Sequence, residues 1–150
     1  MIQRIQSLYL LLTTIMSGLF LTGRIINFTE DNISTLNLDF SGIERMSENV
    51  ESLPLLSFLL AFIPLLSFII IFLFKNRKLQ MKMTVFLIFI IAVQIGLLAW
   101  YSYYVITNFN AEINPGIKLI LPVVELTLAY LAYSGIRKDE ELVRSYDRLR

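Results

Sequence analysis

The hydrophobic residues of this chain are gathered into four long blocks and do not recur at the spacing of an amphipathic helix or strand. Three blocks contain no charged residue: Ile5–Gly23 has 19 residues, Ser52–Phe74 has 23 and Met83–Ala111 has 29. The fourth block, Leu119–Ile136, is interrupted only by Glu125. Because about 20 helical residues cross the hydrocarbon core of a bilayer, each block is long enough to span a membrane.

These blocks predict an all-α membrane protein, a single domain with four transmembrane helices. We place the spans at about residues 5–23, 53–74, 83–105 and 119–136. This leaves an outer loop at 24–51 and a short C-terminal helix in the tail at 137–150. The composition agrees with a membrane protein, because 56% of the 150 residues are hydrophobic and the mean hydropathy is +0.67.

Lysine and arginine residues are distributed unevenly between the two sides that the spans define. Only Arg24, Arg45 and Lys118 lie on the side of the outer loop. Basic residues in short loops stay in the cytoplasm, so both termini are expected there, and the 24–51 loop is expected in the periplasm. We expect the first span to be a retained signal-anchor. The ten basic residues on the other side are Arg4, Lys75, Arg77, Lys78, Lys82, Arg137, Lys138, Arg144, Arg148 and Arg150.

The outer loop contains a pattern typical of a strand. Leu36, Leu38 and Phe40 alternate with polar residues, and Ile25–Phe40 is predicted to form a β-hairpin. The residues from Ser41 onward are predicted to form a short surface helix that leads into the second span. Since an isolated hairpin is only marginally stable in water, this hairpin is expected to pack on the helix bundle or on a partner.

The chain contains neither cysteine nor histidine. This composition excludes disulfides, thiolate and imidazole metal sites, and catalytic relays built on histidine or cysteine. No catalytic motif stands out in the rest of the sequence. We therefore expect a protein without enzymatic activity, metal or cofactor, whose partners are the lipid bilayer and other membrane proteins rather than nucleic acid.

Glu125 is the only ionisable residue inside a predicted span. It lies 12 positions before the first basic residue of the tail, and Gln94 lies 12 positions after the last basic residue of the preceding cytoplasmic loop. At about 1.5 Å per residue, both lie about 18 Å from the cytoplasmic rim. A similar count along the first two spans reaches Ser17 and Pro64. Glu125, Gln94 and Ser17 are therefore predicted to form a polar contact within the membrane.

Two roles are open for this polar contact. Helices joined by a short loop are usually neighbours, so Glu125 is expected to meet Gln94 and to hold the helices together, or to contact another subunit. The other role is a proton or cation site. A relay needs a chain of ionisable groups, however, and the spans contain only one.

The C-terminal tail has the spacing of a helix with one apolar face. Leu142, Tyr146 and Leu149 lie at i, i+4 and i+7, and Arg144 is placed to pair with acidic neighbours on the same helix. One interpretation is a docking helix for a protein partner or for the inner leaflet, although the mixed charge argues against a purely lipid-binding segment. The other is a solvated extension of the fourth span.

The two ends of the chain resemble a known family. The opening MIQRIQSLYLL and the closing IRKDEELVRSYDRLR are similar to an uncharacterised bacterial family of small four-helix integral membrane proteins, a domain of unknown function. The resemblance implies a location in the inner membrane of a double-membraned bacterium. It implies no activity and no catalytic residues.

The function expected first is that of a non-enzymatic subunit or assembly factor of a larger inner-membrane complex. Its helices and tail would dock the partners, and a protein-export translocon or an envelope-biogenesis machine would be a natural host. The alternative is a small transporter or channel component that uses Glu125, which would need oligomerisation because four helices are few for a carrier. The sequence leaves the oligomeric state open.

Overall fold

Four α-helices make up most of the protein. The computed structural model describes residues 3–30, 34–45, 48–114 and 116–148. Three short 3-10 helices, η1, η2 and η3, adjoin the longer helices. The helical elements are α1 (Gln3–Gly18), η1 (Leu19–Leu21), α2 (Pro54–Phe72), η2 (Leu73–Lys75), α3 (Arg77–Phe109), η3 (Ile117–Ile120) and α4 (Leu121–Arg148).

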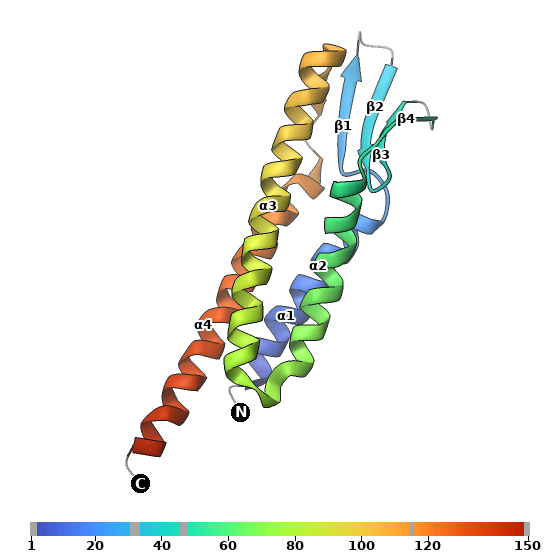
Figure 1. Ribbon diagram of the computed structural model, residues 1–150. Coiled ribbons are helices and arrows are strands. Elements are labelled where there is room, and N and C mark those ends of the chain that lie inside the picture. The colour runs from blue at the N-terminus through green and yellow to red at the C-terminus, as the bar shows by residue number, and fades with distance from the viewer. Residues whose placement is uncertain (1–2, 31–33, 46–47, 115, 149–150) are drawn as a thin grey trace.

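The helices form an up-and-down bundle. Helix α1 packs on α2 and α4, and α3 packs on the same two neighbours, so the four helices close a ring. Figure 1 shows both ends of the chain at one end of this bundle, where α4 continues beyond the other helices. We call this the inner end of the bundle, and the opposite end, which carries a sheet, the outer end.

Residues with restricted backbone preferences set the helix boundaries. Pro54 is in the first turn of α2, where its missing N–H group costs no hydrogen bond. Asn76 caps α3, because its side-chain oxygen accepts a hydrogen bond of 3.3 Å from the backbone N–H of Leu79. Asn110, with a φ of 48°, adopts the left-handed conformation that ends α3.

Three helical segments are long and apolar enough to cross a membrane: Pro54–Lys75, Arg77–Phe109 and Ile117–Val143. They coincide to within one residue with the second predicted span and contain the third and fourth. The segment Ile5–Leu21 is also helical and apolar but is shorter, with 17 residues. Helix α4 runs without interruption from the fourth predicted span into the tail, so the predicted tail helix is the end of a longer helix.

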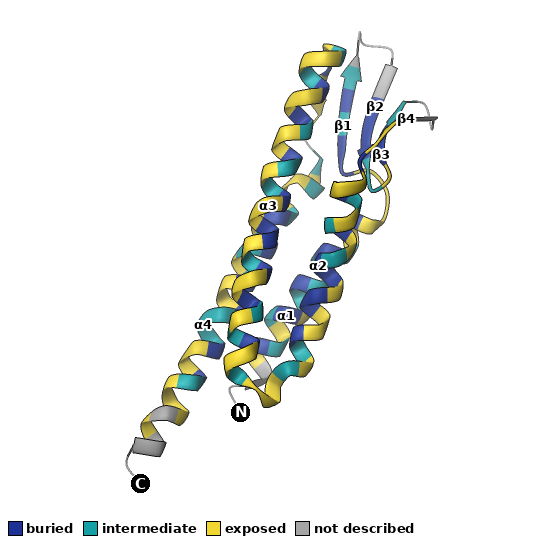
Figure 2. Ribbon diagram, in the orientation of Figure 1, coloured by how far each residue is buried: buried dark blue, intermediate teal, exposed yellow. Residues whose placement is uncertain are grey.

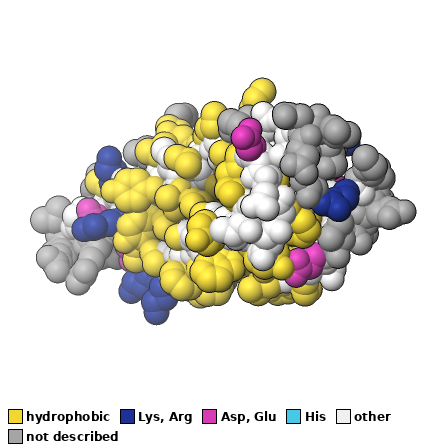
Figure 3. All heavy atoms as spheres, turned by 90° about the horizontal axis from the view of Figure 1, so that it is seen from above, with side chains coloured by type: hydrophobic (Ala, Val, Ile, Leu, Met, Phe, Trp, Pro, Cys, Tyr) yellow, Lys and Arg dark blue, Asp and Glu magenta, His cyan; other side chains and the backbone are white. Residues whose placement is uncertain are grey.

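Hydrophobic side chains cover the outside of the bundle as well as its interior. Ile15, Phe58, Phe89 and Val123, one from each helix, are all exposed. Figure 2 shows exposed residues running along the outward faces of the helices. Figure 3, which looks at the molecule from its outer end, shows hydrophobic side chains over the middle of that view. Contiguous apolar surface of this extent marks a face that contacts lipid or another protein.

A five-stranded antiparallel sheet lies at the outer end of the bundle, so the prediction of an all-α protein is wrong for this end of the molecule. Its order is β4-β3-β2-β1-β5, and the last strand comes from the loop between α3 and α4. The predicted hairpin is confirmed as β1 and β2, paired with Ile26 opposite Leu38. The strands are β1 (Ile26–Glu30), β2 (Ser34–Asp39), β3 (Gly42–Arg45), β4 (Glu48–Ser52) and β5 (Glu112–Asn114).

The prediction of a surface helix after Ser41 is wrong, because this segment forms β3 and β4. Gly42 has a φ of 140°, and a Cβ at this position would overlap the backbone carbonyl oxygen of Glu51. The chain therefore turns sharply here and pairs Ile43 with Leu38. Ile43 is fully buried, and the energy of this burial outweighs the weak helical preference of the acidic residues nearby.

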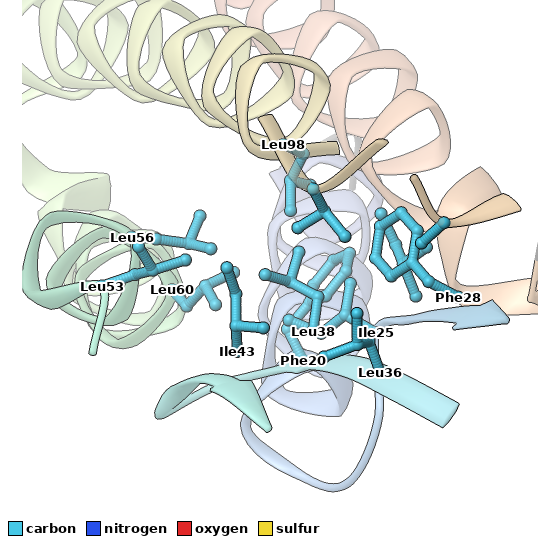
Figure 4. Close-up of a cluster of buried hydrophobic side chains, with 13 residues drawn as sticks. Phe20, Ile25, Phe28, Leu36, Leu38, Ile43, Leu53, Leu56, Leu60 and Leu98 are labelled. Carbon is cyan, nitrogen blue, oxygen red and sulfur yellow. The ribbon is translucent and has the colours of Figure 1, made fainter. Parts of the chain in front are cut away.

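The inner face of the sheet packs on the outer ends of the helices. Phe28 and Leu36 of the sheet belong to the same buried cluster as Leu56 of α2 and Leu98 of α3 (Figure 4). We call this cluster the outer core. Its buried members are Phe20, Ile25, Ile26, Phe28, Leu36, Leu38, Ile43, Leu53, Leu56, Leu60, Leu98, Val105 and Ala111.

A second cluster fills the bundle towards the inner end, and we call it the inner core. The helices contribute its members and the sheet does not. They are Leu10, Ile63, Leu66, Ile70, Leu87, Ile90, Ile91, Ala129 and Ala132. Buried polar side chains of the helices lie among the same turns, and they form the candidate functional site.

Candidate functional site in the helix bundle

The facing sides of α1 and α4 carry small and polar residues. Buried positions alternate at three and four residues along both helices, which is the spacing of one helix face. Small residues on such a face allow two helices to approach closely. The buried positions are Gln6, Leu10, Thr13 and Ser17 on α1, and Pro122, Glu125, Ala129, Ala132, Ile136 and Asp139 on α4.

A buried hydrogen bond fixes the register of these two antiparallel helices. Nε2 of Gln6 donates to Oδ2 of Asp139 over 2.7 Å. One turn away, Gly135 makes room for Gln6, since a Cβ on Gly135 would lie 2.7 Å from Cγ of Gln6. Ser17 is 11 residues from Gln6 and Glu125 is 10 residues from Gly135, so the antiparallel helices bring Ser17 close to the level of Glu125.

The register of α3 against α4 follows from residues of both helices that line the same cavity, above and below the middle of the bundle. Lys82 and Arg137 line one cavity at the inner end, and Leu98 and Pro122 line another towards the outer end. Gln94 is 12 residues from Lys82, and Glu125 is 12 residues from Arg137. The antiparallel helices therefore bring Gln94 to the level of Glu125.

The three polar residues predicted to meet within the membrane are all buried. The exposed fraction is 0% for Glu125, 0% for Gln94 and 2% for Ser17. The hydroxyl group of Ser17 donates to the carbonyl oxygen of Thr13 over 2.8 Å, within its own helix. Pro64, expected at the same depth, is buried inside α2.

The structure does not show the hydrogen bond expected between Glu125 and Gln94. Among the described residues, neither carboxyl oxygen of Glu125 has a hydrogen-bond partner, and neither amide atom of Gln94 has one. A buried polar atom without a partner costs free energy, so this level of the bundle holds unused hydrogen-bonding capacity. The nearest buried residues before and after Glu125 on α4 are Pro122 and Ala129, and both are apolar. The role of the three residues stays a prediction.

A second polar group at the inner end was not foreseen from the sequence. Besides the bond from Gln6, Asp139 accepts at its backbone carbonyl oxygen a hydrogen bond of 3.2 Å from Nη1 of Arg77. Nε2 of Gln80 donates to the carbonyl oxygen of Ile70 over 3.2 Å. These bonds connect α1, α3 and α4, and they tie α3 to the end of α2. The i, i+4 spacing of Gln6 and Leu10 could have indicated that Gln6 is buried. Asp139 gave no such signal, because it belongs to a charged tail whose sequence is typical of a solvated helix.

The remainder of the tail extends beyond this polar group. Arg137 donates from Nε to Oε1 of Glu141 over 2.9 Å in an exposed ion pair. Leu142, one of the predicted docking residues, is 48% exposed. The side chains of the other three, Arg144, Tyr146 and Leu149, lie outside the described residues. Docking by the tail therefore stays a prediction.

Comparison with known proteins identifies the family of the chain. No curated protein and no solved structure matches it. A family model described as a domain of unknown function, DUF4293, matches residues 2–149. This match covers nearly the whole chain, including both ends and every residue of the polar level in the bundle. The chain therefore belongs to the DUF4293 family of domains of unknown function.

Proposed function

We propose that the protein is a four-span protein of a bacterial inner membrane, with both termini in the cytoplasm. Within the membrane it acts as a non-enzymatic subunit or accessory factor of a larger complex. Support for insertion comes from the hydrophobic side chains exposed on all four helices. Water would disfavour such a surface, whereas lipid solvates it.

Helix α1 together with η1 is the shortest of the proposed spans. The 17 residues of Ile5–Leu21 reach about 26 Å at about 1.5 Å per residue, close to the shortest length that crosses a bilayer. Ile5, Leu8 and Ile15 are exposed, as lipid-facing residues would be. The opposite face of α1 packs on α2 and α4, so α1 lies in the same layer as the other three helices.

The observation that carries the proposed role is the free end of α4. This helix runs on to Arg148 past the inner end of the bundle, and Leu142 and Val143 are exposed on the extension. An apolar face on a helix that extends beyond its own bundle suits the groove of another protein. An accessory subunit needs such a surface, whereas a self-contained carrier does not.

The orientation can be tested with single cysteines, because the chain has none of its own. Ser41 and Lys75 are exposed at opposite ends of the bundle, which makes them better labelling sites than the buried Asn37. In intact spheroplasts an impermeant maleimide is expected to label Ser41→Cys and to spare Lys75→Cys. Labelling of Lys75→Cys alone would overturn the orientation.

Docking by the tail can be tested with two variants, each of which adds one negative charge at a different position. Leu142→Asp removes an apolar side chain from the extension, whereas Ser145→Asp adds the same charge at an exposed polar position. After purification in mild detergent, mass spectrometry should find partner chains with the wild type and with Ser145→Asp, but not with Leu142→Asp. Retention by both variants would remove the tail as the docking site. Absence of any reproducible partner of the wild type would remove the proposed role.

A proton or cation site at Glu125 is the second candidate function. Its support is the unused hydrogen-bonding capacity of Glu125 and Gln94 at one buried level. A carboxyl group without protein partners can take up a proton or a cation with little rearrangement, and intramembrane carboxyl groups are often functional. Among the residues that the structure describes, no second buried ionisable group lies at this level to complete a relay.

Two variants of Glu125 separate the two candidates. Glu125→Gln keeps the shape of the side chain and removes its titration. Glu125→Leu removes the polar group as well, and this breaks no hydrogen bond, because neither carboxyl oxygen has a partner among the described residues. If the protein is an accessory subunit, both variants should support growth under conditions that require the gene, at normal abundance. Loss of growth with both variants at normal abundance would place the proton or cation site first.

A further inference from the structure

A charged cavity opens between α3 and α4 at the inner end of the bundle. Its volume is about 590 Å³. Lys78 and Lys82 lie on the α3 side, one helical turn apart, so their side chains share a face. The α4 side is formed by Tyr133, Arg137, Glu140 and Glu141.

The charges of this lining leave a small positive excess. Three basic side chains and two carboxylates line the cavity, so the net charge is +1. One of the carboxylates, that of Glu141, already pairs with Arg137 over 2.9 Å. A ligand with a single negative charge would neutralise the excess. A phosphodiester carries such a charge and accepts hydrogen bonds from several basic groups at once.

The cavity lies where each helix passes from charged to apolar residues. Lys82 directly precedes the uncharged block of α3, and Arg137 directly follows the apolar block of α4. In the proposed orientation this is the level of the inner-leaflet headgroups. Basic pockets between spans on this side are suited to lipid headgroups.

An apolar stripe continues from the cavity towards the middle of the membrane. On α3, Val85 and Phe89 follow Lys82 at three and seven residues, which keeps them on one face. On α4, Tyr130 lies one turn above Tyr133. Phe89 is 63% exposed and Tyr130 is 62% exposed, so both can contact an acyl chain.

We infer that this groove binds an anionic glycerophospholipid with one phosphodiester, of the phosphatidylglycerol type. The phosphate would lie between Lys78, Lys82 and Arg137, and an acyl chain would lie along Val85 and Phe89. An acidic peptide would match the charges but would leave the apolar stripe uncovered. The inference rests on the proposed membrane orientation, in which the inner end lies at the headgroups.

The test compares two double variants that each remove two positive charges at the inner end. Lys82→Gln with Arg137→Gln removes charges from the cavity. Lys75→Gln with Lys138→Gln removes exposed charges that do not line it. Native mass spectrometry in detergent would measure phosphatidylglycerol and phosphatidylcholine retained by each form. We expect the cavity variant to bind phosphatidylglycerol about 30-fold more weakly, and the control to bind as the wild type does.

Several outcomes would overturn the inference. Equal losses in both double variants would mean that only the overall charge matters, and no loss would mean that the cavity is not the site. Equal retention of phosphatidylcholine and phosphatidylglycerol by the wild type would show that headgroup charge is not recognised. Competition by glycerol phosphate as strong as by the lipid would indicate an anion site without an acyl-chain groove.

The experiment remains informative if the first variant fails to fold. Lys78→Gln with Lys82→Gln leaves the ion pair of Arg137 and Glu141 intact and should also lose phosphatidylglycerol, and thermal unfolding would verify that it is folded. Because the measurement is made in detergent, it does not depend on orientation. A failure of the lipid site is therefore distinct from a failure of the proposed topology, which cysteine labelling tests.

Discussion

The outer core and the inner core of this protein share leucines and isoleucines, but they differ in their aromatic residues and in the polar residues buried around them. In the outer core, Phe20 and Phe28 pack among leucines and isoleucines. The buried polar residues near it in the described part of the chain are few: Asn37 of β2, and Ser102, which lies between Leu98 and Val105 on α3. The inner core contains Ala129 and Ala132. Buried polar residues lie on the surrounding helix turns: Gln6, Thr13, Ser17, Ser67, Gln80, Thr84, Gln94, Glu125 and Asp139.

The proposed membrane orientation explains this difference. A sheet that covers the outer end meets water on its other face, so the hydrophobic effect drives its large apolar side chains onto the bundle. In lipid, apolar side chains gain little by leaving one apolar environment for another. Helices there associate through close packing of small residues and through hydrogen bonds between helices. In the proposed membrane orientation, the composition of the two cores thus follows the change of solvent along one bundle.

The largest expected effect comes from shortening an outer-core side chain. Phe28→Ala should lower the free energy of unfolding by about 3–5 kcal/mol, because it removes a large apolar group and leaves a cavity. Phe58→Ala is the matched control, since Phe58 is 62% exposed on α2 whereas Phe28 is 1% exposed. Thermal unfolding in detergent would measure both. Equal losses of unfolding free energy would contradict the view that burial away from water stabilises Phe28 but not Phe58.

The helices of this fold could be predicted from the sequence, but most of the sheet could not. Uninterrupted apolar blocks are a local signal, and so is the alternation that marked the hairpin. Strand β5 has only three residues, Glu112–Asn114, and pairs with β1 from the far end of α3. Strand β3 contains Glu44 and Arg45, and charged residues of this kind are more typical of a surface helix than of a strand. Both are set by distant contacts, which a local pattern does not reveal.

The candidate site could be predicted in part for a similar reason. Counting residues inward from the charged rims identified Glu125, Gln94 and Ser17, which are buried, because a straight helix converts sequence distance into depth. The same count does not give side-chain directions, so the expected bond between Glu125 and Gln94 had no firm basis. Asp139 was missed because its partner, Gln6, is 133 residues away.

An intermediate effect is expected from crowding the small residues of the inner end. Gly135→Ala places a methyl group against the buried side chain of Gln6 and should destabilise the protein by about 1–3 kcal/mol. Gly96→Ala is the control, because nothing lies within 4 Å of a Cβ at this position of α3. Denaturation in detergent should show a loss for the first variant and none for the second. If Gly135→Ala is neutral, close packing at this point does not stabilise the inner end.

The smallest expected effect concerns a hydrogen bond between α1 and α2. The hydroxyl group of Ser67 on α2 donates to the carbonyl oxygen of Leu10 on α1 over 2.9 Å, and it accepts from the hydroxyl group of Thr14 over 3.1 Å. Hydrogen bonds between helices in membranes average about 0.6 kcal/mol and reach about 1.7 kcal/mol. Ser67→Ala should therefore lower stability by about this amount, although the substitution removes only one oxygen atom.

Ser102→Ala supplies the matched control, because the hydroxyl group of Ser102 donates over 2.7 Å to the carbonyl oxygen of Leu98 in its own helix. Its loss breaks no hydrogen bond between helices in the described part of the chain, and alanine has the higher helix propensity, so stability should stay the same or rise slightly. Both variants would be compared by reversible unfolding in mixed detergent. If the two behave alike, hydrogen bonds between α1 and α2 do not stabilise the bundle. The buried polar residues around the inner core would then require a functional explanation, which would favour the proton or cation site at Glu125.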